Sequence, residues 1–428
     1  MAKQNERTLE NITFPKSNDM LGLDGFELDP VETPESFYFK KRKKIILKNI
    51  KANVLYEGRP QCNCGSNMPM VLHDYKKLTV KDIFHGRSNV AIVLRRPRFK
   101  CHRCKKTTTI TPDVIHHRHY MTRRLVEEIQ ILGLEHPFTR VEKMTGVNEK
   151  IIRNIVNEFI EILDKAIPLT KPNVVGIDEA HSGVLTAALL VITDIENGML
   201  LELSEDGLSR EVVEDVLIKM SGDNDVKYGV SDMCGSYHRA MKNIFPNLPT
   251  IVDKRHVQIK AKEALATVRD QVRIKTKKNS AKLYGDRGII NKRRHQLNES
   301  EMKKIVSWSK RYPRLGKAYD LKEGFYDLYN YEAFGKAMYA FEAWSKSIPN
   351  NLENEFGPVR DMFIREQRQI KNYFDSGKKY TNAVTETING LVKEIDRTGR
   401  GYSFKVLRAK ALHKYGIWNE EAIHEHVF

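Results

Sequence analysis

The chain has 428 residues, 40% of them hydrophobic, which is too long for one ordinary core and predicts a multidomain protein. Its 72 Lys and Arg against 55 Asp and Glu leave a formal net charge of +17, which favours a polyanion such as nucleic acid as partner over charge kept only for solubility. The N-terminus lacks the apolar core of a secretion signal, and the longest nearly apolar run, residues 184–192, is too short to span a bilayer, so we expect a soluble cytoplasmic protein without a membrane partner.

The N-terminal part of the chain predicts an arm followed by a small β-rich domain. Residues 1–45 carry Pro, Asp and Glu without clear periodicity and end in the basic run KKRKK, so we interpret them as an N-terminal arm. Over residues 46–118, strand-like segments such as IILKNIKANVLY and NVAIVLRRPRFK are separated by Gly, Asn and Pro. This pattern is typical of a small ribbon domain.

Four cysteines of this β-rich segment fall in two close pairs at strand–turn junctions, Cys62 with Cys64 and Cys101 with Cys104. In a reducing compartment such pairs favour metal ligation over disulfides. Tetrahedral zinc takes four sulfur or nitrogen ligands, so the pairs predict a Zn²⁺ site of the zinc-ribbon kind. Two alternatives stay open: His102 could replace a thiolate, or the ribbon folds without metal and uses the cysteines as small buried apolar residues.

Residues 119–168 change to a helical period and predict three helices. TRRLVEEIQILGL gives the first, FTRVEKMTG the second, and the third begins at the good N-cap Asn148. The predicted apolar face of the third helix consists of Ile151, Ile155, Phe159 and Leu163. A short helix, a glycine turn and a longer amphipathic helix are typical of a helix-turn-helix, although an ordinary three-helix bundle fits the same pattern. In a helix-turn-helix, the DNA-reading residues would be Lys150, Arg153 and Asn154.

After the linker IPLTKPN, the pattern predicts an α/β domain interrupted by a helical insertion. Residues 172–253 predict three strands, a helix, a strand, a helix and a fifth strand, which is the order of a ribonuclease-H-like sheet. Residues 254–380 are helical and charged, and 254–294 hold 14 Lys and Arg against 3 Asp and Glu, so we interpret this insertion as a grip on phosphates. Residues 381–428 return to the α/β domain.

Two aspartates follow the first and fourth predicted strands of this domain. Asp178 closes the apolar run VVGI, and Asp232 follows YGVS. Singly, each is more often a turn cap than a catalytic residue. In a ribonuclease-H-like sheet, however, these strands are neighbours, so we expect the two carboxylates to converge and to need a cation. Glu386, on a helix predicted over about 382–396, would complete a site for two Mg²⁺ or Mn²⁺ ions.

Four motifs in this order resemble the DDE transposase domain of the ISL3 family of bacterial insertion sequences. They are GIDEA with Asp178, SDMCGSYHRAM with Asp232, VDKRHV with Asp253 and His256, and TNAVTETINGLVKEIDRTGRGYSF with Glu386 and Asn389. The resemblance spans nearly the whole chain, because that family also has an N-terminal cysteine ribbon and a helix-turn-helix. It implies a multidomain α+β protein with a zinc-ribbon-like domain, a helix-turn-helix, and a ribonuclease-H-like α/β catalytic domain with a helical insertion.

The resemblance also implies roles for single residues. The catalytic triad, which would hold the Mg²⁺ or Mn²⁺ ions, would be Asp178, Asp232 and Glu386. The accessory residues near the site would be Asp253, His256 and Asn389. From their position alone, Arg397 and Arg400, which bracket Gly399 just after the last motif helix, are candidate DNA-phosphate contacts, and a solvated charge cluster fits them equally well. The chain departs from the family pattern twice: Arg255 stands where the family has an aromatic residue, and the first cysteine pair is Cys-x-Cys rather than Cys-x-x-Cys.

The activity and partners that the resemblance implies are those of a transposase. The protein would cleave DNA at transposon terminal repeats and transfer the freed 3′ ends to target DNA. Its partner would be double-stranded DNA, on which a homodimer or larger assembly pairs two ends, in the bacterial cytoplasm and associated with the nucleoid. Two alternatives remain: a nuclease of the same fold that cuts without joining, and a DNA-binding regulator that has lost catalysis. The presence of all three carboxylates argues against the regulator.

Overall fold

The structure is a computed structural model that divides into two compact units, Met1–Leu163 and Asp164–Phe428. The residues that it describes are 12–13, 23–28, 36–40, 43–85, 88–181, 188–205, 209–222, 225–275, 287–399 and 401–428. Among them, no helix combines the length and the apolar character that crossing a bilayer requires.

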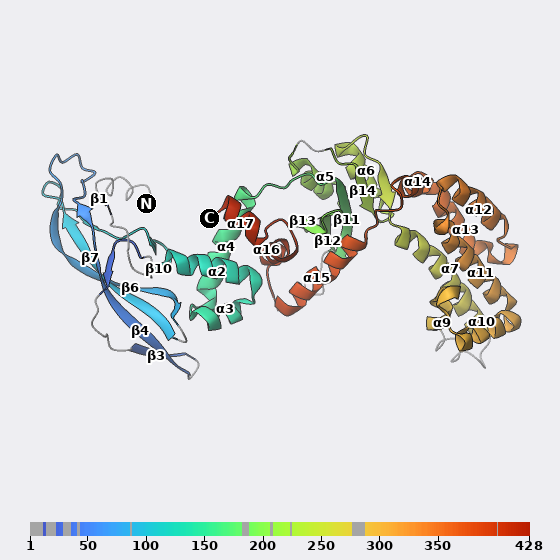
Figure 1. Cartoon of the computed structure of the whole chain (residues 1–428), viewed down its shortest axis with the longest axis horizontal. Helices are drawn as coiled ribbons and strands as arrows, with labels where there is room; N and C mark the ends of the chain where they lie inside the picture. The colour runs from blue at the N-terminus through green and yellow to red at the C-terminus, as the bar shows by residue number, and fades with distance from the viewer. Residues whose placement is uncertain are drawn as a thin grey trace. The chain divides into compact units, whose positions relative to one another are not determined.

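A long mixed β-sheet dominates the first unit (Figure 1). Its strands are β2 (Phe26–Leu28), β3 (Ser36–Lys40), β4 (Lys43–Val54), β6 (Val71–His85), β7 (Ser88–Lys100), β8 (Thr107–Thr109), β9 (Ile115–His116) and β10 (Met121–Thr122). They run in the order β2-β4-β7-β6-β10-β9, with β3 added to β4 and β8 added to β7. A separate pair is formed by β1 (Ile12–Thr13) and β5 (Glu57–Gly58).

The core of this sheet is built from residues that fit a half-buried pleated surface. Val80 of β6 and Leu94 of β7 are fully buried and pack in one cluster with Leu23 and Phe26. Residues 23–28, which the sequence pattern assigned to the N-terminal arm, thus contribute to the core of the sheet.

Three helices follow the sheet: α2 (Arg123–Glu135), α3 (Phe138–Thr145) and α4 (Glu149–Ala166). Gly146 ends α3 in the left-handed conformation, with φ of 65°, and Asn148 caps α4 by accepting the Lys150 N–H at 3.0 Å. The prediction of the apolar face of α4 was wrong at one position, because Ile151 is 37% exposed and Ile152 is buried. These positions lie about 100° apart around the helix axis, and the buried stripe is centred near the second.

The second unit is built on a five-stranded sheet. Its strands are β11 (Val174–His181), β12 (Ala188–Asp194), β13 (Met199–Ser204), β14 (Tyr228–Ser231) and β15 (Thr250–Val252), in the order β13-β12-β11-β14-β15. The first three pair antiparallel, whereas β14 lies parallel to β11 and β15 parallel to β14. The first and fourth strands of the domain are therefore neighbours.

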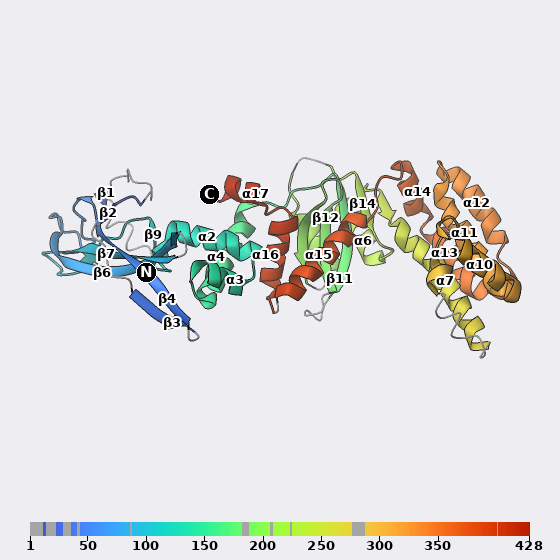
Figure 2. The same cartoon turned by 60° about the horizontal axis from the view of Figure 1, so that its bottom comes forward.

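Helices cover both faces of this sheet (Figure 2). On one face, α5 (Arg210–Lys219) and α6 (Gly235–Ile244) pack against Val175 and Ile177. Two other helices also contact the sheet: α15 (Ala383–Gly399) contacts β11 and β12, and α16 (Phe404–Tyr415) contacts β13. The last helix of the chain is α17 (Glu420–His426). Since side chains alternate along a strand, β11 directs Gly176 and Asp178 toward α15.

The chain between β15 and α15 forms a helical insertion. Its described helices are α7 (Lys254–Lys275), α9 (Arg287–Asn291), α10 (Glu299–Arg311), α11 (Pro313–Asp327), α12 (Phe334–Lys346), α13 (Glu353–Arg365) and α14 (Gln367–Asp375), with the 3-10 turns η2 (Arg294–Gln296), η3 (Leu328–Asn330) and η4 (Asn350–Leu352). Stacked aromatic rings fill its centre, as in Phe341 and Phe363, whose centroids lie 4.2 Å apart. The same core cluster includes Val230 and Ile251, so it anchors the insertion to β14 and β15.

Candidate functional site

The register of the sheet places Asp178 beside Asp232. In the parallel pair of β11 and β14, Ile177 lies opposite Ser231, so the next residues, Asp178 and Asp232, continue the same register. Neighbouring strands are about 4.8 Å apart, and side chains at paired positions point to the same face. Asp232 also accepts the Cys234 N–H at 2.9 Å, where the chain turns into α6. The sheet thus brings the first two predicted carboxylates together.

Asp178 lies in an environment that disfavours its negative charge. Its side chain is buried, with the residue 7% exposed. Burial raises the pKa of Asp178 to about 6, and the charges of Asp232 and Glu386 act in the same direction. Its oxygens accept hydrogen bonds from the Glu179 N–H at 2.9 Å and from Asn389 Nδ2 at 3.0 Å. An added cation would therefore stabilise the ionised form of this cluster.

We expect the contribution of Asp178 to the stability of the protein without added divalent ions to fall as the pH rises from about 4 to about 6. Because the pKa of Asp178 is raised in the folded state, folding is favoured while this carboxyl is protonated, and that contribution disappears above the folded-state pKa. A change from 3.8 to about 6 corresponds to about 3 kcal/mol. Thermal unfolding across this pH range measures the effect. The dependence should shrink in Asp178→Asn, and the same profile in that variant would assign it to another group.

A polar stripe of α15 docks this helix against the sheet. Its buried members, spaced three and four residues apart, are Asn382, which directly precedes the helix, Thr385 and Asn389. Thr385 Oγ1 lies 2.7 Å from Thr193 Oγ1. Gly176 leaves room for this contact, since a Cβ at its position would lie 2.6 Å from Thr385 Oγ1 and 2.5 Å from Thr193 Oγ1. The close approach carries Glu386, the next residue of α15, to the edge of the site.

Glu386 is held by a cation of α7. Arg255 Nη1 forms an ion pair with Glu386 Oε2, in which the Arg255 side chain is 69% exposed and that of Glu386 is 23% exposed. Ligand atoms of Glu386, Asp253 and His256 lie within 4.8 Å of one another. Over the described part of the chain, the three predicted catalytic carboxylates do not form such a group. The ion pair thus holds Glu386 near Asp253 and His256, at the start of α7.

Asp253 joins the starts of two helices. Its Oδ2 accepts the Arg255 N–H at 2.9 Å and the His256 N–H at 3.3 Å, which caps α7, and its Oδ1 accepts the Asn382 N–H at 2.9 Å, where α15 begins. Burial would raise the pKa of Asp253, but the His256 side chain and the Asn382 N–H hold it below its ordinary value. In return, Asp253 raises the pKa of His256. Asp253 thus fixes the start of the Glu386 helix relative to α7.

The four cysteines of the β-rich segment come together in the first unit. Their sulfur atoms lie within 4.8 Å of one another, with Cys62 Sγ 3.4 Å from Cys104 Sγ and Cys64 Sγ 3.7 Å from Cys101 Sγ. The backbone N–H of Cys104 contributes most to lowering the pKa of Cys101 to about 6. His102 does not belong to this group. Four converging thiols are a suitable donor set for tetrahedral zinc.

The predicted groove-reading residues lie at the start of α4. Lys150 and Asn154 are exposed. Arg153 forms an ion pair with Glu149 at 2.6 Å, and its guanidinium lies 4.9 Å from the centroid of the Phe138 ring. Arg153 therefore helps to hold α3 against α4, and a contact of its guanidinium with DNA would compete with these interactions.

The helix that carries Glu386 is longer than predicted. It continues to Gly399, beyond the expected end near 396. Arg397 is exposed in its last turn, where a cation interacts favourably with the helix dipole, instead of following the helix. Arg400 lies outside the described residues.

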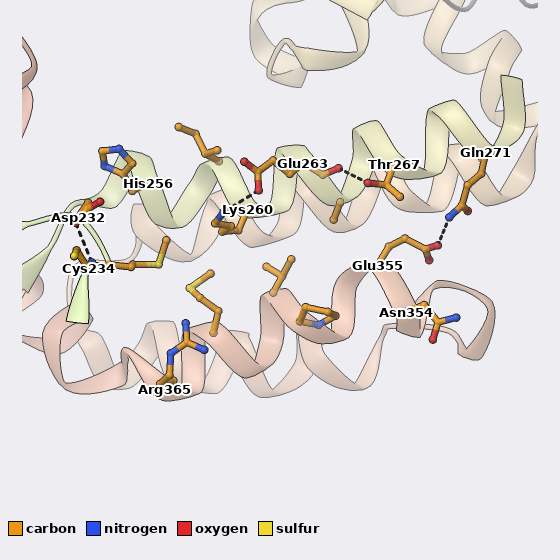
Figure 3. Close-up of a pocket in the computed structure, with 16 residues that line it drawn as sticks. Asp232, Cys234, His256, Lys260, Glu263, Thr267, Gln271, Asn354, Glu355 and Arg365 are labelled. Atoms are coloured by element: carbon orange, nitrogen blue, oxygen red, sulfur yellow. Dashed lines mark hydrogen bonds and ion pairs between the residues drawn. The ribbon is translucent and has the colours of Figure 1, made fainter. Parts of the chain in front are cut away.

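A groove leads away from the candidate site between α7 and α13 (Figure 3). Its volume is about 880 Å³. Asp232 and His256 line one end of it, and Gln271 and Glu355 line the other. The sequence pattern gave no signal for this groove, because its two walls come from segments far apart in the chain.

Two contacts of the site were also not predicted from sequence. The docking of Thr385 over Gly176 has a local signal in the sequence, which is the spacing of the polar residues Asn382, Thr385 and Asn389. The ion pair between Arg255 and Glu386 joins residues 131 positions apart, and no local spacing encodes it. Arg255 stood out in the sequence only as a departure from the family pattern.

Comparison with known proteins bears on the second unit. A family model described as Transposase, of the DDE type named ISL3, matches residues 175–411, which is more than half of the 428 residues. The matched range runs from β11 into α16 and includes the helical insertion. Among curated proteins, none gives a significant match to the chain.

Proposed function

Because this chain belongs to the ISL3 family of transposases, we propose that it cleaves DNA at the terminal repeats of a transposon and transfers the freed ends to target DNA. The observation that carries the proposal is the position of Asp178 and Asp232, each directly after the paired residues Ile177 and Ser231 of adjacent parallel strands, beside the helix of Glu386. Carboxylates in this arrangement suit divalent ions in phosphoryl transfer. The proposed accessory residues are Asp253, His256 and Asn389.

For the domains, we propose a ribonuclease-H-like fold over residues 172–253 and 381–428, interrupted by the insertion 254–380. Its support is the order of the five strands, three antiparallel followed by two parallel. We further propose a zinc-ribbon-like domain over 46–118 and a helix-turn-helix over 119–168 that recognise the terminal repeats. The short α3, its left-handed end and the amphipathic α4 support the second of these.

The residues of the proposed site fit Mg²⁺ or Mn²⁺. Hard cations prefer carboxylate oxygens, and they would stabilise the charge of Asp178, whose pKa is raised first by burial and further by Asp232 and Glu386. Asp178, Asp232 and Glu386 would hold two ions, which supply activation of the attacking oxygen and stabilisation of the leaving oxygen. For Glu386 to take part, its ion pair with Arg255 has to open.

The neighbouring side chains of the chain itself would position these ligands. Asn389 donates to Asp178 and so fixes the orientation of that carboxylate. Asp253, through its bonds to the starts of α7 and α15, fixes the base of the Glu386 helix. Arg255, once released from Glu386, would present an exposed guanidinium at the edge of the site, where it can contact a DNA phosphate.

A cleavage and strand-transfer assay tests this function. The purified chain with Mg²⁺ should nick a duplex that carries the transposon end and should join a pre-cleaved 3′ end to a plasmid. Glu386→Gln should reduce both reactions, whereas Glu394→Gln, at an exposed position of the same helix, should not. Cleavage without joined product would favour a nuclease of the same fold. Binding of ends without cleavage in any divalent metal would favour a DNA-binding regulator.

We propose double-stranded DNA as the partner and a homodimer or larger assembly on it. The formal net charge of +17 supports a polyanionic partner, and joining two transposon ends calls for two active sites. Light scattering of the chain with and without transposon-end duplex should show at least two chains per complex only when DNA is present.

We propose that the four clustered thiols hold Zn²⁺, and we expect about one zinc per chain in the purified protein. Cys101→Ser should lower the zinc content and the protease resistance of the first unit, because Cys101 is the one buried member of the four clustered cysteines. Elemental analysis and limited proteolysis measure the two effects. Cys234→Ser is the control, since that cysteine lies outside the cluster. A zinc-free preparation of equal protease resistance would show that the cysteines are only buried apolar residues.

A further inference from the structure

The groove between α7 and α13 extends the proposed catalytic site along the insertion (Figure 3). His256 lines its near end and Gln271 its far end, and both belong to α7. The rise of 1.5 Å per helical residue makes their separation about 22 Å. One strand of DNA advances about 3.4 Å per nucleotide, so the groove is as long as several nucleotides. A strand that leaves the site at Asp232 can therefore continue along it.

The lining of the groove suits nucleobases better than phosphates. Its buried apolar residues are Ala264, Val359 and Met362. Its acidic members are Asp232, Glu263 and Glu355, and its basic members are Lys260 and Arg365. Lys260 pairs with Glu263 at 3.0 Å, and Arg365 donates to Glu366 at 2.9 Å. With acidic and basic groups nearly balanced, the groove lacks the excess of cations that binds a DNA backbone.

The groove is too narrow for a duplex. α7 and α13 pack directly on each other, and Val268 of the first shares a core cluster with Val359 of the second. Helices in such contact have axes about 8–10 Å apart, whereas the major groove of a duplex alone is about 12 Å wide. The space therefore fits an unpaired strand.

The far end of the groove contains an acceptor without a donor. The side chain of Glu355 is 6% exposed, and its Oε1 accepts from Gln271 Nε2 at 2.8 Å and from Arg314 Nη2 at 2.9 Å. Its Oε2 has no hydrogen-bond partner among the described residues, which is unfavourable for a buried carboxylate. Glu355 lines this end of the groove, so a group bound there could supply the missing donor. The amino group of cytosine is a donor that carboxylates accept.

We propose that this groove binds unpaired nucleotides of the DNA strand beside the cleavage site, with an amino-bearing base against Glu355 at the far end. The identity of the strand rests on the proposed transposase function. Binding of the strand in the groove does not require catalysis, so the two can be tested apart.

Anisotropy with labelled single strands of about 20 nucleotides, longer than one typical site, tests the proposal in the full chain without added divalent ions. Oligo(dC) should bind about fivefold or more tightly than oligo(dT), because the cytosine amino group adds one hydrogen bond to Glu355 and thymine has no amino group. Glu355→Gln keeps an acceptor for Gln271 and Arg314 but places an amide NH₂ at the Oε2 position. The preference for oligo(dC) should therefore vanish or reverse, and an unchanged preference would overturn the assignment of Glu355.

A second variant tests the groove itself. Thr267 is an exposed residue that lines the middle of the groove, so Thr267→Trp should fill the groove. This variant should bind both oligo(dC) and oligo(dT) more weakly than the natural protein, whereas its affinity for duplex DNA should be unchanged. Ala343→Trp, at an exposed position of α12 outside the groove, is the matched control. Single strands that bind Thr267→Trp as tightly as the natural protein would overturn the proposal. If Thr267→Trp weakens single strands but the natural protein never cleaves transposon ends, the groove stands and the transposase function falls.

Discussion

Replacing Asp178 with asparagine should lower the rate of strand cleavage by about 1000-fold or more, the scale seen when a central catalytic group is lost. Asparagine keeps the shape of the side chain but not its charge, so it should hold a divalent ion far more weakly. The loss is best measured as nicking of a labelled transposon-end duplex in Mg²⁺ and again in Mn²⁺.

The fold should survive this change. Asn389 donates to Asp178, and its own Oδ1 has no hydrogen-bond partner among the described residues, so its amide can turn to accept from the new asparagine. Removal of a buried charge should also raise the unfolding temperature near neutral pH. Asp215→Asn, at an exposed position of α5, controls for the chemistry of the substitution. Cleavage by Asp178→Asn at the natural rate would remove Asp178 from the proposed triad.

Gly176→Val should both destabilise the second unit and reduce cleavage. Even a Cβ at this position would lie 2.5 Å from Ile195 Cδ1 and 2.6 Å from Thr385 Oγ1, so valine has to push α15 away from β11. Overpacking of this kind costs about 1–3 kcal/mol, which corresponds to a fall of several degrees in the unfolding temperature. Because α15 carries Glu386 and Asn389, its displacement should separate them from Asp178.

Gly390→Ala provides the contrast for this experiment. Gly390 lies on the same helix with nothing within 4 Å of a Cβ, so alanine should be neutral or slightly stabilising by up to about 1 kcal/mol. Differential scanning calorimetry measures the unfolding temperature of both variants, and the nicking assay measures their cleavage rate. Equal unfolding temperatures for the two would show that the approach of α15 to β11 is not tight. A destabilised Gly176→Val that cleaves normally would separate the position of α15 from catalysis.

The order of the strands could be predicted from the sequence because it depends on local patterns. Apolar runs ended by Asp178 and Asp232 indicate two strands, and the parallel pairing of β11 with β14 makes these strands neighbours. The end of the first strand was predicted too early, because β11 continues past Asp178 to His181 by pairing with β12. The cysteine cluster could be predicted from the sequence for the same reason. Its two cysteine pairs are separated in the chain by the antiparallel strands β6 and β7, and the pairing of these strands brings the two cysteine pairs together. In both cases the geometry follows from spacing along the chain.

Contacts that depend on packing between distant segments could not be predicted. Arg255 reaches Glu386 because α7 and α15 start at the same place, which only the folded chain determines. The side of α4 that is buried was predicted imperfectly for a related reason: both Ile151 and Ile152 are apolar, and the neighbouring helices select the second. The groove arises from the packing of α7 on α13 in the same way.

The hydrogen bond between Asp253 and Asn382 closes a very long loop at its neck. The chain leaves the sheet after β15, forms the whole insertion, and returns to the second unit at Asn382, which is hydrogen-bonded to Asp253 at the end of β15. Residues can therefore be gained or lost at the distal end of the insertion without changing the position of Glu386. Such a closure would let the same five-stranded sheet accept insertions of very different size.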